Sequence, residues 1–220
     1  MADAEAPVPG FRTRVGYQAM LLGGFATLAA AFLALGDIST RGPIADREAE
    51  DIRTSLSQVV PDQLHDNNLL EDQLSLQQAG QTVLVYRGTL KGKVSAVAFP
   101  ISGKGYSGTI SLIMGVAADG KILGVRVLAH SETPGLGDKI EEKKDDWIFS
   151  FNGHSLDNTS NQEWAVKKDG GRFDQFSGAT ITPRAVVKAI KEGLEFFRAH
   201  QQQLLAVIPA SGEGGKADES

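Results

Sequence analysis

The longest apolar stretch of the chain lies near its N-terminus. From Val15 to Gly36 the sequence carries no charged side chain, and Arg12 and Arg14 stand immediately before this stretch. At a rise of 1.5 Å per residue, these 22 residues would form a helix of about 33 Å, which is enough to cross a hydrocarbon core of about 30 Å. The pattern therefore predicts one transmembrane helix over 15–36. The two arginines favour a cytoplasmic tail over 1–14.

A cleaved signal peptide is the competing interpretation of this stretch, because Ala34–Gly36 resembles a small-x-small cleavage site. The apolar regions of signal peptides cover about 7–15 residues, and the stretch here is longer, which favours an uncleaved anchor. The charges do not fix the orientation of the anchor, since Arg41, Arg47 and Arg53 follow on its other side. Large domains are also translocated largely regardless of charge.

Helical spacing returns after a short linker expected over 37–43. Apolar side chains recur three or four residues apart between residues 45 and 59, with charged residues between them, and Pro61 follows. This spacing predicts an amphipathic helix that ends before the proline. The next segment, over 62–78, is polar and its structure is ambiguous. Residues 37–80 are therefore expected to be a linker and helical region ahead of the main domain.

The pattern then changes to short β-branched runs bounded by glycine. Asp119-Gly120, between the last two runs, is typical of a tight hairpin turn, because glycine adopts the positive φ that such turns require. The runs are expected to pair as an antiparallel sheet. They cover Thr82–Tyr86, Val94–Ile101, Thr109–Val116 and Lys121–Leu128.

Two helices are predicted after the strands. Helical spacing resumes over 138–151, and a last helix begins near Thr182, which can cap it, with Pro183 at its first position. An antiparallel sheet flanked by helices makes an α+β domain, expected over 81–205. The glycine-rich and charged residues 206–220 are typical of a disordered tail.

Composition narrows the chemistry that this domain can carry. The 220 residues include no cysteine, which excludes a disulfide, a thiol nucleophile and a cysteine-ligated cluster. The four histidines have no partners at metal-ligand spacing, so we expect no metal site and no catalytic residue. The net charge of −5 argues against a nucleic-acid partner, which would favour a basic surface.

The segment from Asp174 to Thr180 combines small residues with the start of a predicted helix. Small residues such as Gly178 and Ala179 let backbone N–H groups approach an anion, and the positive end of a helix dipole favours one. The Thr180 hydroxyl stands just ahead of this site, where a phosphate esterified to it would be well placed. An ordinary capping loop would explain the same residues, because short motifs often match by chance.

The pattern Asp-x-x-Ser-Gly-Ala-Thr, with Ser177 at its fourth position, resembles the flavinylation signal of the FMN-binding domain family. A second segment over 130–137, which contains Glu-Thr-Pro-Gly-Leu-Gly, resembles the flavin-bordering loop of the same family. The resemblance implies the fold of that domain, with FMN joined to Thr180 by a phosphoester that a dedicated flavin transferase forms from FAD. It also implies flavin contacts from both segments: Asp174, Ser177, Gly178 and Ala179 in the first, and Glu132, Thr133, Gly135, Leu136 and Gly137 in the second.

Together with the anchor, these motifs resemble the G subunits of the Rnf electron-transport complexes. The resemblance implies a redox subunit of an ion-translocating ferredoxin–NAD oxidoreductase, which works with other membrane subunits and is not catalytic alone. It implies a single-pass protein of a bacterial inner membrane, with its soluble domain on the periplasmic side. Two alternatives stay open. One is the FMN-carrying C subunit of a sodium-pumping NADH:quinone reductase, which shares both segments, and the other is a membrane-anchored scaffold without a cofactor.

The residues around these motifs also have ordinary structural explanations. His130 is expected to be a structural residue at a strand end rather than a proton relay. Trp147 and Trp164 are expected to pack in the core rather than relay electrons. Lys167 and Lys168 are expected on a solvated face, although either could neutralise a phosphate.

Overall fold

The computed structural model describes residues 15–78 and 80–206, and it divides the chain into two compact units that meet between Asp51 and Ile52. The first unit consists of the N-terminal part of helix α1 (Val15–Val59), and the second contains the end of that helix and the α+β domain. The tail predicted over 1–14 lies outside the described residues, and so does the tail predicted over 206–220 except for its first residue.

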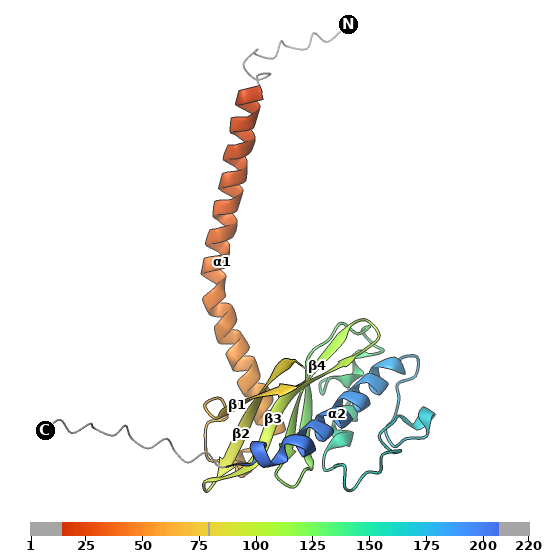
Figure 1. The fold of residues 1–220 in the computed structure, drawn as a ribbon. Helices are drawn as coiled ribbons and strands as arrows, with labels where there is room; N and C mark the ends of the chain where they lie inside the picture. Colours follow the sequence, from red (N-terminus) through yellow and green to blue (C-terminus); the bar gives the residue numbers. More distant parts are fainter. Residues whose placement is uncertain (1–14, 79, 207–220) are drawn as a thin grey trace, which may run out of the picture. The chain divides into compact units, whose positions relative to one another are not determined.

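Helix α1 contains an apolar segment over Val15–Asp37, which by its length and composition could cross a membrane (Figure 1). Large apolar side chains such as Met20 and Leu22 are exposed along it, as expected of a segment that lipid would cover. The linker expected over 37–43 is wrong, because the helix continues through it. A proline inside a helix removes one backbone hydrogen bond and usually kinks the helix, but helical turns can continue on both sides of it, as they do at Pro43.

The sheet has five antiparallel strands in the order of the sequence. They are β1 (Gln73–Gln78), β2 (Gln81–Leu90), β3 (Lys93–Lys104), β4 (Thr109–Ala117) and β5 (Ile122–Ala129). Strands β2 to β5 confirm the four predicted β-branched runs. Strand β1 was not predicted, since its only apolar residues, Leu74 and Leu76, stand among glutamines and serine in a short edge strand.

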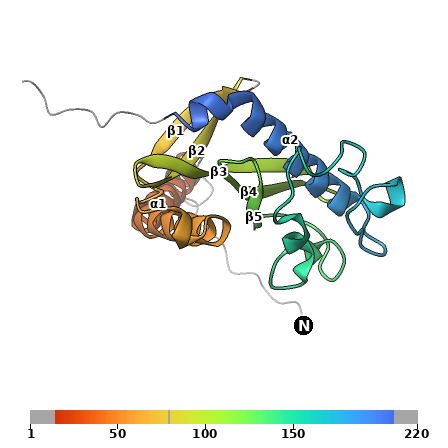
Figure 2. The same ribbon diagram turned by 90° about the horizontal axis from the view of Figure 1, so that it is seen from below.

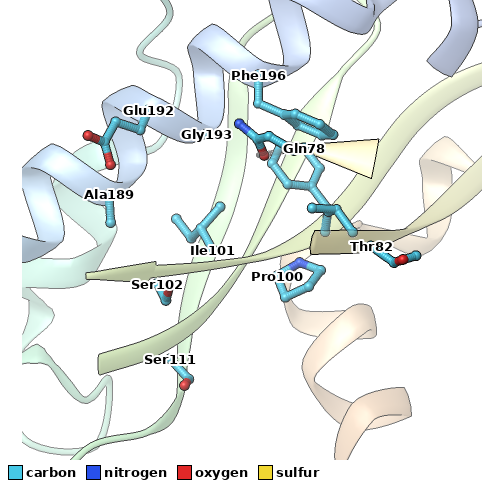
Figure 3. A pocket seen from close by; sticks show the side chains of 12 residues that line it. Gln78, Thr82, Pro100, Ile101, Ser102, Ser111, Ala189, Glu192, Gly193 and Phe196 are labelled. Atoms are coloured by element: carbon cyan, nitrogen blue, oxygen red, sulfur yellow. The ribbon is translucent and has the colours of Figure 1, made fainter. Parts of the chain in front are cut away.

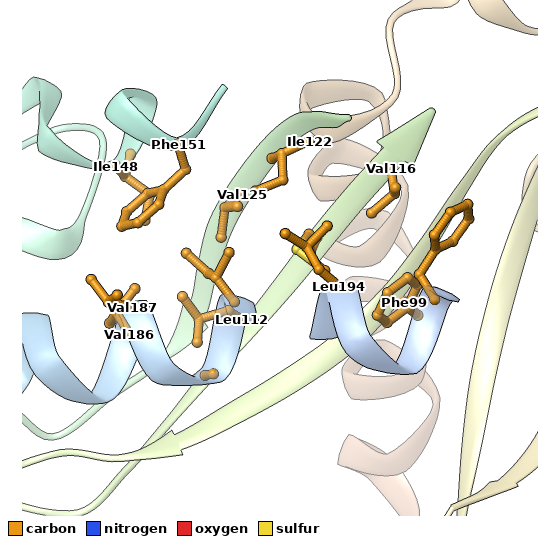
Figure 4. Close-up of a cluster of buried hydrophobic side chains, with 14 of the residues drawn as sticks. Phe99, Leu112, Val116, Ile122, Val125, Ile148, Phe151, Val186, Val187 and Leu194 are labelled. Carbon is orange, nitrogen blue, oxygen red and sulfur yellow. The ribbon is translucent and has the colours of Figure 1, made fainter. Parts of the chain in front are cut away.

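Helix α2 (Ile181–Leu204) packs on one face of the sheet, along β3 and β4 (Figure 2). Val186, Ile190 and Leu194 form its buried stripe, as the helical spacing predicts. These side chains meet Leu112 and Met114 of β4, together with 3₁₀ segments that close the end of the core (Figure 4). Burying such side chains contributes about 1.5–3 kcal/mol each.

The last turns of α1 pack on the opposite face of the sheet, where Leu56 and Val59 join a second buried cluster. Gly115 of β4 pairs with Gly124 of β5 directly beneath them. A Cβ atom on Gly115 would overlap the Val59 carbonyl group, and one on Gly124 would lie 3.2 Å from the Gln58 carbonyl oxygen. The glycine pair therefore makes the space in which the helix end meets the sheet.

The segment between β5 and α2 is built mainly of loops and short 3₁₀ helices. The continuous helix predicted over 138–151 is wrong, because the structure has two 3₁₀ helices there, Asp138–Ile140 and Asp146–Phe151. Asp145 separates them with an extended backbone, and its side chain accepts a hydrogen bond from the Trp147 N–H at 2.9 Å. Such an aspartate starts a new turn rather than continuing the previous one.

We predict that Gly115→Ala lowers the free energy of unfolding of the domain by about 1–3 kcal/mol, because the added methyl group displaces the end of α1 from the sheet. Chemical denaturation of the full chain in detergent measures the change. Gly108→Ala is the matched control, since its Cβ would lie 3.8 Å from the nearest atom, Ser131 Cβ. Equal stability of the two variants would contradict the role assigned to the glycine pair.

Candidate functional site

A cleft of about 290 Å³ lies beside the start of α2, where three separate segments meet. The turn between β3 and β4 supplies one side, the loop after β5 supplies another, and the start of α2 supplies the third. The cleft is lined by Tyr106, Glu132, Thr133, Leu136, Gly137, Gly178, Ala179, Thr180, Ile181 and Thr182. The fold thus brings together the two motifs that the sequence analysis singled out. Of the residues implied there, Asp174, Ser177 and Gly135 do not line the cleft.

Glu132 is the buried carboxylate at the centre of this arrangement, with only 5% of the residue exposed. Its carboxylate accepts hydrogen bonds from the backbone N–H groups of Tyr106, at 3.2 Å, and Ser107, at 3.0 Å. It also accepts a hydrogen bond from the hydroxyl of Thr182, in the first turn of α2. One side chain therefore joins all three segments of the cleft.

The charge on Glu132 is stabilised by these donors. Burial alone would raise the pKa of Glu132, but the hydrogen bonds from Thr182, Ser107 and Tyr106 outweigh burial, and the pKa is lowered. A carboxylate that accepts several hydrogen bonds is favoured in its ionised form. Glu132 is thus a buried anion held by protein donors.

His130 follows β5 and fixes the backbone of the same loop. Its Nδ1 accepts a hydrogen bond from the Glu132 N–H at 3.0 Å, so its Nε2 carries the proton and donates to Glu141 Oε1 at 2.9 Å. Both ring nitrogens are occupied by protein groups. This arrangement agrees with the structural role expected of His130.

Two kinds of glycine shape the cleft. Gly105 and Gly137 provide space, because a Cβ on Gly105 would overlap the Glu132 carboxylate and one on Gly137 would lie 2.8 Å from Glu132 Cβ. Gly135 and Gly178 provide backbone conformation, with φ of 77° and 81°. Side chains with a Cβ adopt this left-handed region only at a cost, so both loop turns depend on glycine.

Thr180 occupies the N-cap position of α2, with φ −70° and ψ −25°, and its side chain makes no capping hydrogen bond. It is half-buried and lines the cleft. The prediction that Thr182 caps the helix is wrong, because the N-cap is Thr180, two residues earlier, and the Thr182 hydroxyl is buried against Glu132. Thr180 and Thr182 both line the cleft, and Thr180 is the one at the N-cap.

Asp174 faces away from the cleft, with 67% of its side chain exposed. Its carboxylate pairs with the Lys167 ammonium group at 2.7 Å, and its backbone carbonyl accepts a hydrogen bond from Trp147 Nε1 at 2.8 Å. Lys167 is itself more than half exposed, as expected of a solvated face. Asp174 therefore presents its side chain to solvent while its backbone is fixed to the core.

Exposed apolar side chains surround the cleft. Tyr106, Leu136 and Ile181 are 71%, 42% and 47% exposed, and all three line it. Within residues 52–206, Leu128 at the end of β5 is the only other large apolar side chain classed as exposed. Tyr106 and Ile181 were not among the predicted site residues. Their signals were the Gly-Tyr-Ser-Gly turn and an isoleucine outside the buried stripe of α2.

A separate cavity of about 320 Å³ lies between α2 and the sheet, where Ile101, Ala189 and Phe196 are among its lining residues (Figure 3). None of the residues implied by the two motifs lines this cavity. The cleft at the start of α2 is therefore the candidate functional site.

The geometry of the cleft fits a phosphate ester of a flat apolar ring system. The start of α2 favours a phosphate, Thr180 presents a hydroxyl there, and the apolar rim suits an aromatic ring. These features, on a five-stranded sheet covered by helices, define a flavin-mononucleotide-binding class of domain. The FMN-binding domain model matches residues 105–195 of the chain.

Two relatives extend this likeness over most of the chain. The G subunit of the ion-translocating oxidoreductase complex of Cereibacter sphaeroides (strain ATCC 17029 / ATH 2.4.9) is 55% identical over 213 residues, which cover 94% of this chain and 97% of that protein. The corresponding G subunit of Stutzerimonas stutzeri is 48% identical over 204 residues, with 89% and 90% covered. The chain belongs to the family of G subunits of ion-translocating oxidoreductase complexes. The crystal structure of Shewanella oneidensis NqrC has 27% sequence identity and a TM-score of 0.45, over 66% of this chain and 73% of that one.

We predict that Glu132→Gln lowers the free energy of unfolding by about 1–3 kcal/mol at pH 7. The NH₂ group of the glutamine side chain would replace one carboxylate oxygen and face a protein N–H or O–H group, from which it cannot accept a hydrogen bond. The pKa of Glu132 is lower in the folded protein than in the unfolded chain. Its stabilisation is thus complete above an unfolded pKa of about 4.3 and is lost as the pH falls through the folded pKa. Urea unfolding at neutral and acid pH should show the two proteins converging in acid.

The control is Glu192→Gln, which removes an exposed helical carboxylate paired with Lys188 at 3.7 Å. It should cost no more than about 0.5 kcal/mol. A constant difference between Glu132→Gln and the unsubstituted protein at every pH would contradict the ionised state assigned to Glu132.

Proposed function

We propose that the chain carries FMN as a phosphoester on Thr180 Oγ1 and transfers electrons through it within an Rnf-type ferredoxin–NAD oxidoreductase complex. The observation that supports this most is the position of Thr180, which lines the cleft at the N-cap of α2 and whose side chain makes no capping hydrogen bond. A phosphate there would meet the positive end of the helix dipole.

The neighbouring hydroxyls are less suited to this ester. The Thr182 side chain is buried, and its hydroxyl donates to Glu132. Ser177 is exposed but does not line the cleft. An ester on Thr180 would leave the Glu132 network intact, whereas an ester on Thr182 would remove one of its three donors.

The rim of the cleft suits the flavin ring. Tyr106, Leu136 and Ile181 offer exposed apolar surface beside Thr180, and burying it against a ring would contribute about 25 cal/mol per Å². When bound, FMN supplies reversible electron transfer, while the protein holds and orients it. Glu132 keeps the three lining segments in place. In this account, the residues of the chain position the flavin and do not themselves react.

Attachment of the flavin requires access by the transferase that the motif implies. Asp174, Ser177 and Gly178 are exposed, so the signal segment lies on the surface where a second protein can reach it. The relatives are named as subunits of an ion-translocating oxidoreductase complex, which supports other membrane subunits as electron donor and acceptor. We assign the apolar segment Val15–Asp37 to the bacterial inner membrane and the domain to the periplasmic side.

We predict that Thr180→Ala abolishes covalent flavin, because it removes the hydroxyl that forms the ester. The change should alter the free energy of unfolding by no more than about 0.5 kcal/mol, since the side chain makes no capping bond. Intact and peptide mass spectrometry after co-expression with the flavin transferase measures the adduct. Thr180→Ser is the matched control and should keep the flavin. An adduct on another residue would refute the assignment to Thr180, and no adduct on the unsubstituted chain would favour the scaffold alternative.

The topology is testable with reporters fused after Leu204, at the end of α2. We expect a reporter that works only after export to be active, because the apolar segment anchors the chain and the domain crosses the membrane. Deletion of Val15–Asp37 should keep the same reporter inactive in the cytoplasm. Activity of a cytoplasm-only reporter at Leu204 would mean that the domain lies on the other side of the membrane.

A further inference from the structure

A row of aromatic side chains runs through the core of the domain from the Thr180 segment to a second cleft. Consecutive rings are in contact, with centroid distances of 5.1, 5.1, 4.4 and 5.3 Å. The rings belong, in order, to Phe176, Trp147, Phe151, Phe173 and Trp164. The row contains both tryptophans of the chain.

One end of the row is fixed to the segment that carries Thr180. Phe176 lies within that segment, and its backbone carbonyl accepts a hydrogen bond from the Ala179 N–H at 3.2 Å. Trp147 packs on the Phe176 ring, and its Nε1 donates to the Asp174 carbonyl at 2.8 Å. Trp147 is therefore the oxidisable side chain of the row that lies nearest to the motif.

The other end of the row reaches the surface. Trp164 is itself 6% exposed, yet it lines a cleft of about 430 Å³ whose other lining residues are largely polar. These are Leu156, Thr159, Asn161, Glu195, Arg198 and Ala199. A small soluble molecule in this cleft would lie beside the indole of Trp164 without entering the core.

The hydrogen bonds of the two indoles favour transfer of the oxidised state (the electron vacancy) from one indole to the other. Trp147 Nε1 donates to a backbone carbonyl, which is not a base, and Trp164 Nε1 is buried without a hydrogen-bond partner among the described residues. An indole that loses one electron would therefore keep its proton, and the vacancy could pass to the other indole. Phenylalanine is much harder to oxidise, so Phe151 and Phe173 serve only as the packed medium between the two indoles.

We propose that Trp147 and Trp164 form a protective path that carries an electron vacancy away from light-excited flavin to the surface. The proposal rests on FMN being attached at Thr180. Trp147 would give one electron to FMN that has absorbed light, and Trp164 would then give one electron to Trp147. A soluble one-electron reductant of the ascorbate class returns an electron to Trp164. The net change is one electron moved from the reductant to the flavin, with no bond of the protein altered.

This path has no part in electron transfer in the dark, because ground-state flavin is too weak an oxidant to remove an electron from indole. Its role begins only when light makes the flavin a strong oxidant. Without the second indole, the vacancy would stay on Trp147 in the core, where it would either recombine with the flavin electron or damage the protein. The structure thus assigns the two indoles different tasks, with Trp147 as donor and Trp164 as exit.

The test uses the full-length protein in detergent, with its flavin adduct measured first by mass spectrometry. After a laser flash, we expect rapid quenching of flavin fluorescence and a long-lived tryptophan-radical absorbance, which added ascorbate removes. Trp164→Phe should keep the quenching but lose the long-lived radical through recombination. Trp147→Phe should lengthen the flavin fluorescence lifetime several-fold. Tyr106→Phe tests the tyrosine on the rim of the cleft as the competing electron donor. Tyr86→Phe, in the second buried cluster on the other face of the sheet, is the matched control and should change neither signal.

The adduct measurement separates the two proposals, since absence of flavin on Thr180 refutes the attachment before any flash is given. In loaded protein, quenching that depends on Tyr106, or a long-lived radical that survives in Trp164→Phe, would overturn the path. A second test needs no substitution. Prolonged illumination in air without ascorbate should oxidise Trp164 in preference to Trp147, and ascorbate should prevent this. Peptide mass mapping that finds Trp147 as the main oxidised tryptophan would also overturn the proposal.

Discussion

The cleft depends on one buried carboxylate. Glu132 accepts hydrogen bonds from the β3–β4 turn and from the first turn of α2, while its own backbone is held by His130. Moving a carboxylate out of water is costly, and only the donors gathered around it offset that cost. The requirement acts in both directions: the donors make the charge tolerable, and the charge holds their three segments together. A loop, a turn and a helix start therefore form one site rather than three independent pieces of surface.

The sequence predicted those elements whose pattern is local. Strands β2 to β5 and helix α2 follow from β-branched runs and from a helical stripe. The errors fall where tertiary contacts decide. Residues 138–151 have helical spacing, but the Asp145 side chain caps a new turn and interrupts the helix. Strand β1 has weak β propensity and exists because β2 pairs with it.

The site was predictable only in part, for the same reason. The motifs point to Thr180 and to the loop after β5, and the fold brings both to one cleft. No sequence pattern shows that Asp174 faces solvent, or that the Thr182 hydroxyl is taken by Glu132. Tyr106 and Ile181 were not among the predicted site residues, because exposed apolar residues are common and become informative only when they gather. Their grouping is a property of the folded chain.

Strand β4 links the two faces of the domain while keeping their tasks separate. Its Gly115 admits the end of α1 on one face, and Leu112 and Met114 meet α2 on the other. The Thr180 cleft forms beyond the opposite end of the strand, at the β3–β4 turn. The atoms nearest to Gly115 and Gly124 belong to none of the residues that hydrogen-bond to the Glu132 carboxylate. Substitutions at the two places should therefore change the free energy of unfolding additively. Strain where α1 joins the sheet therefore need not reach the residues that line the Thr180 cleft.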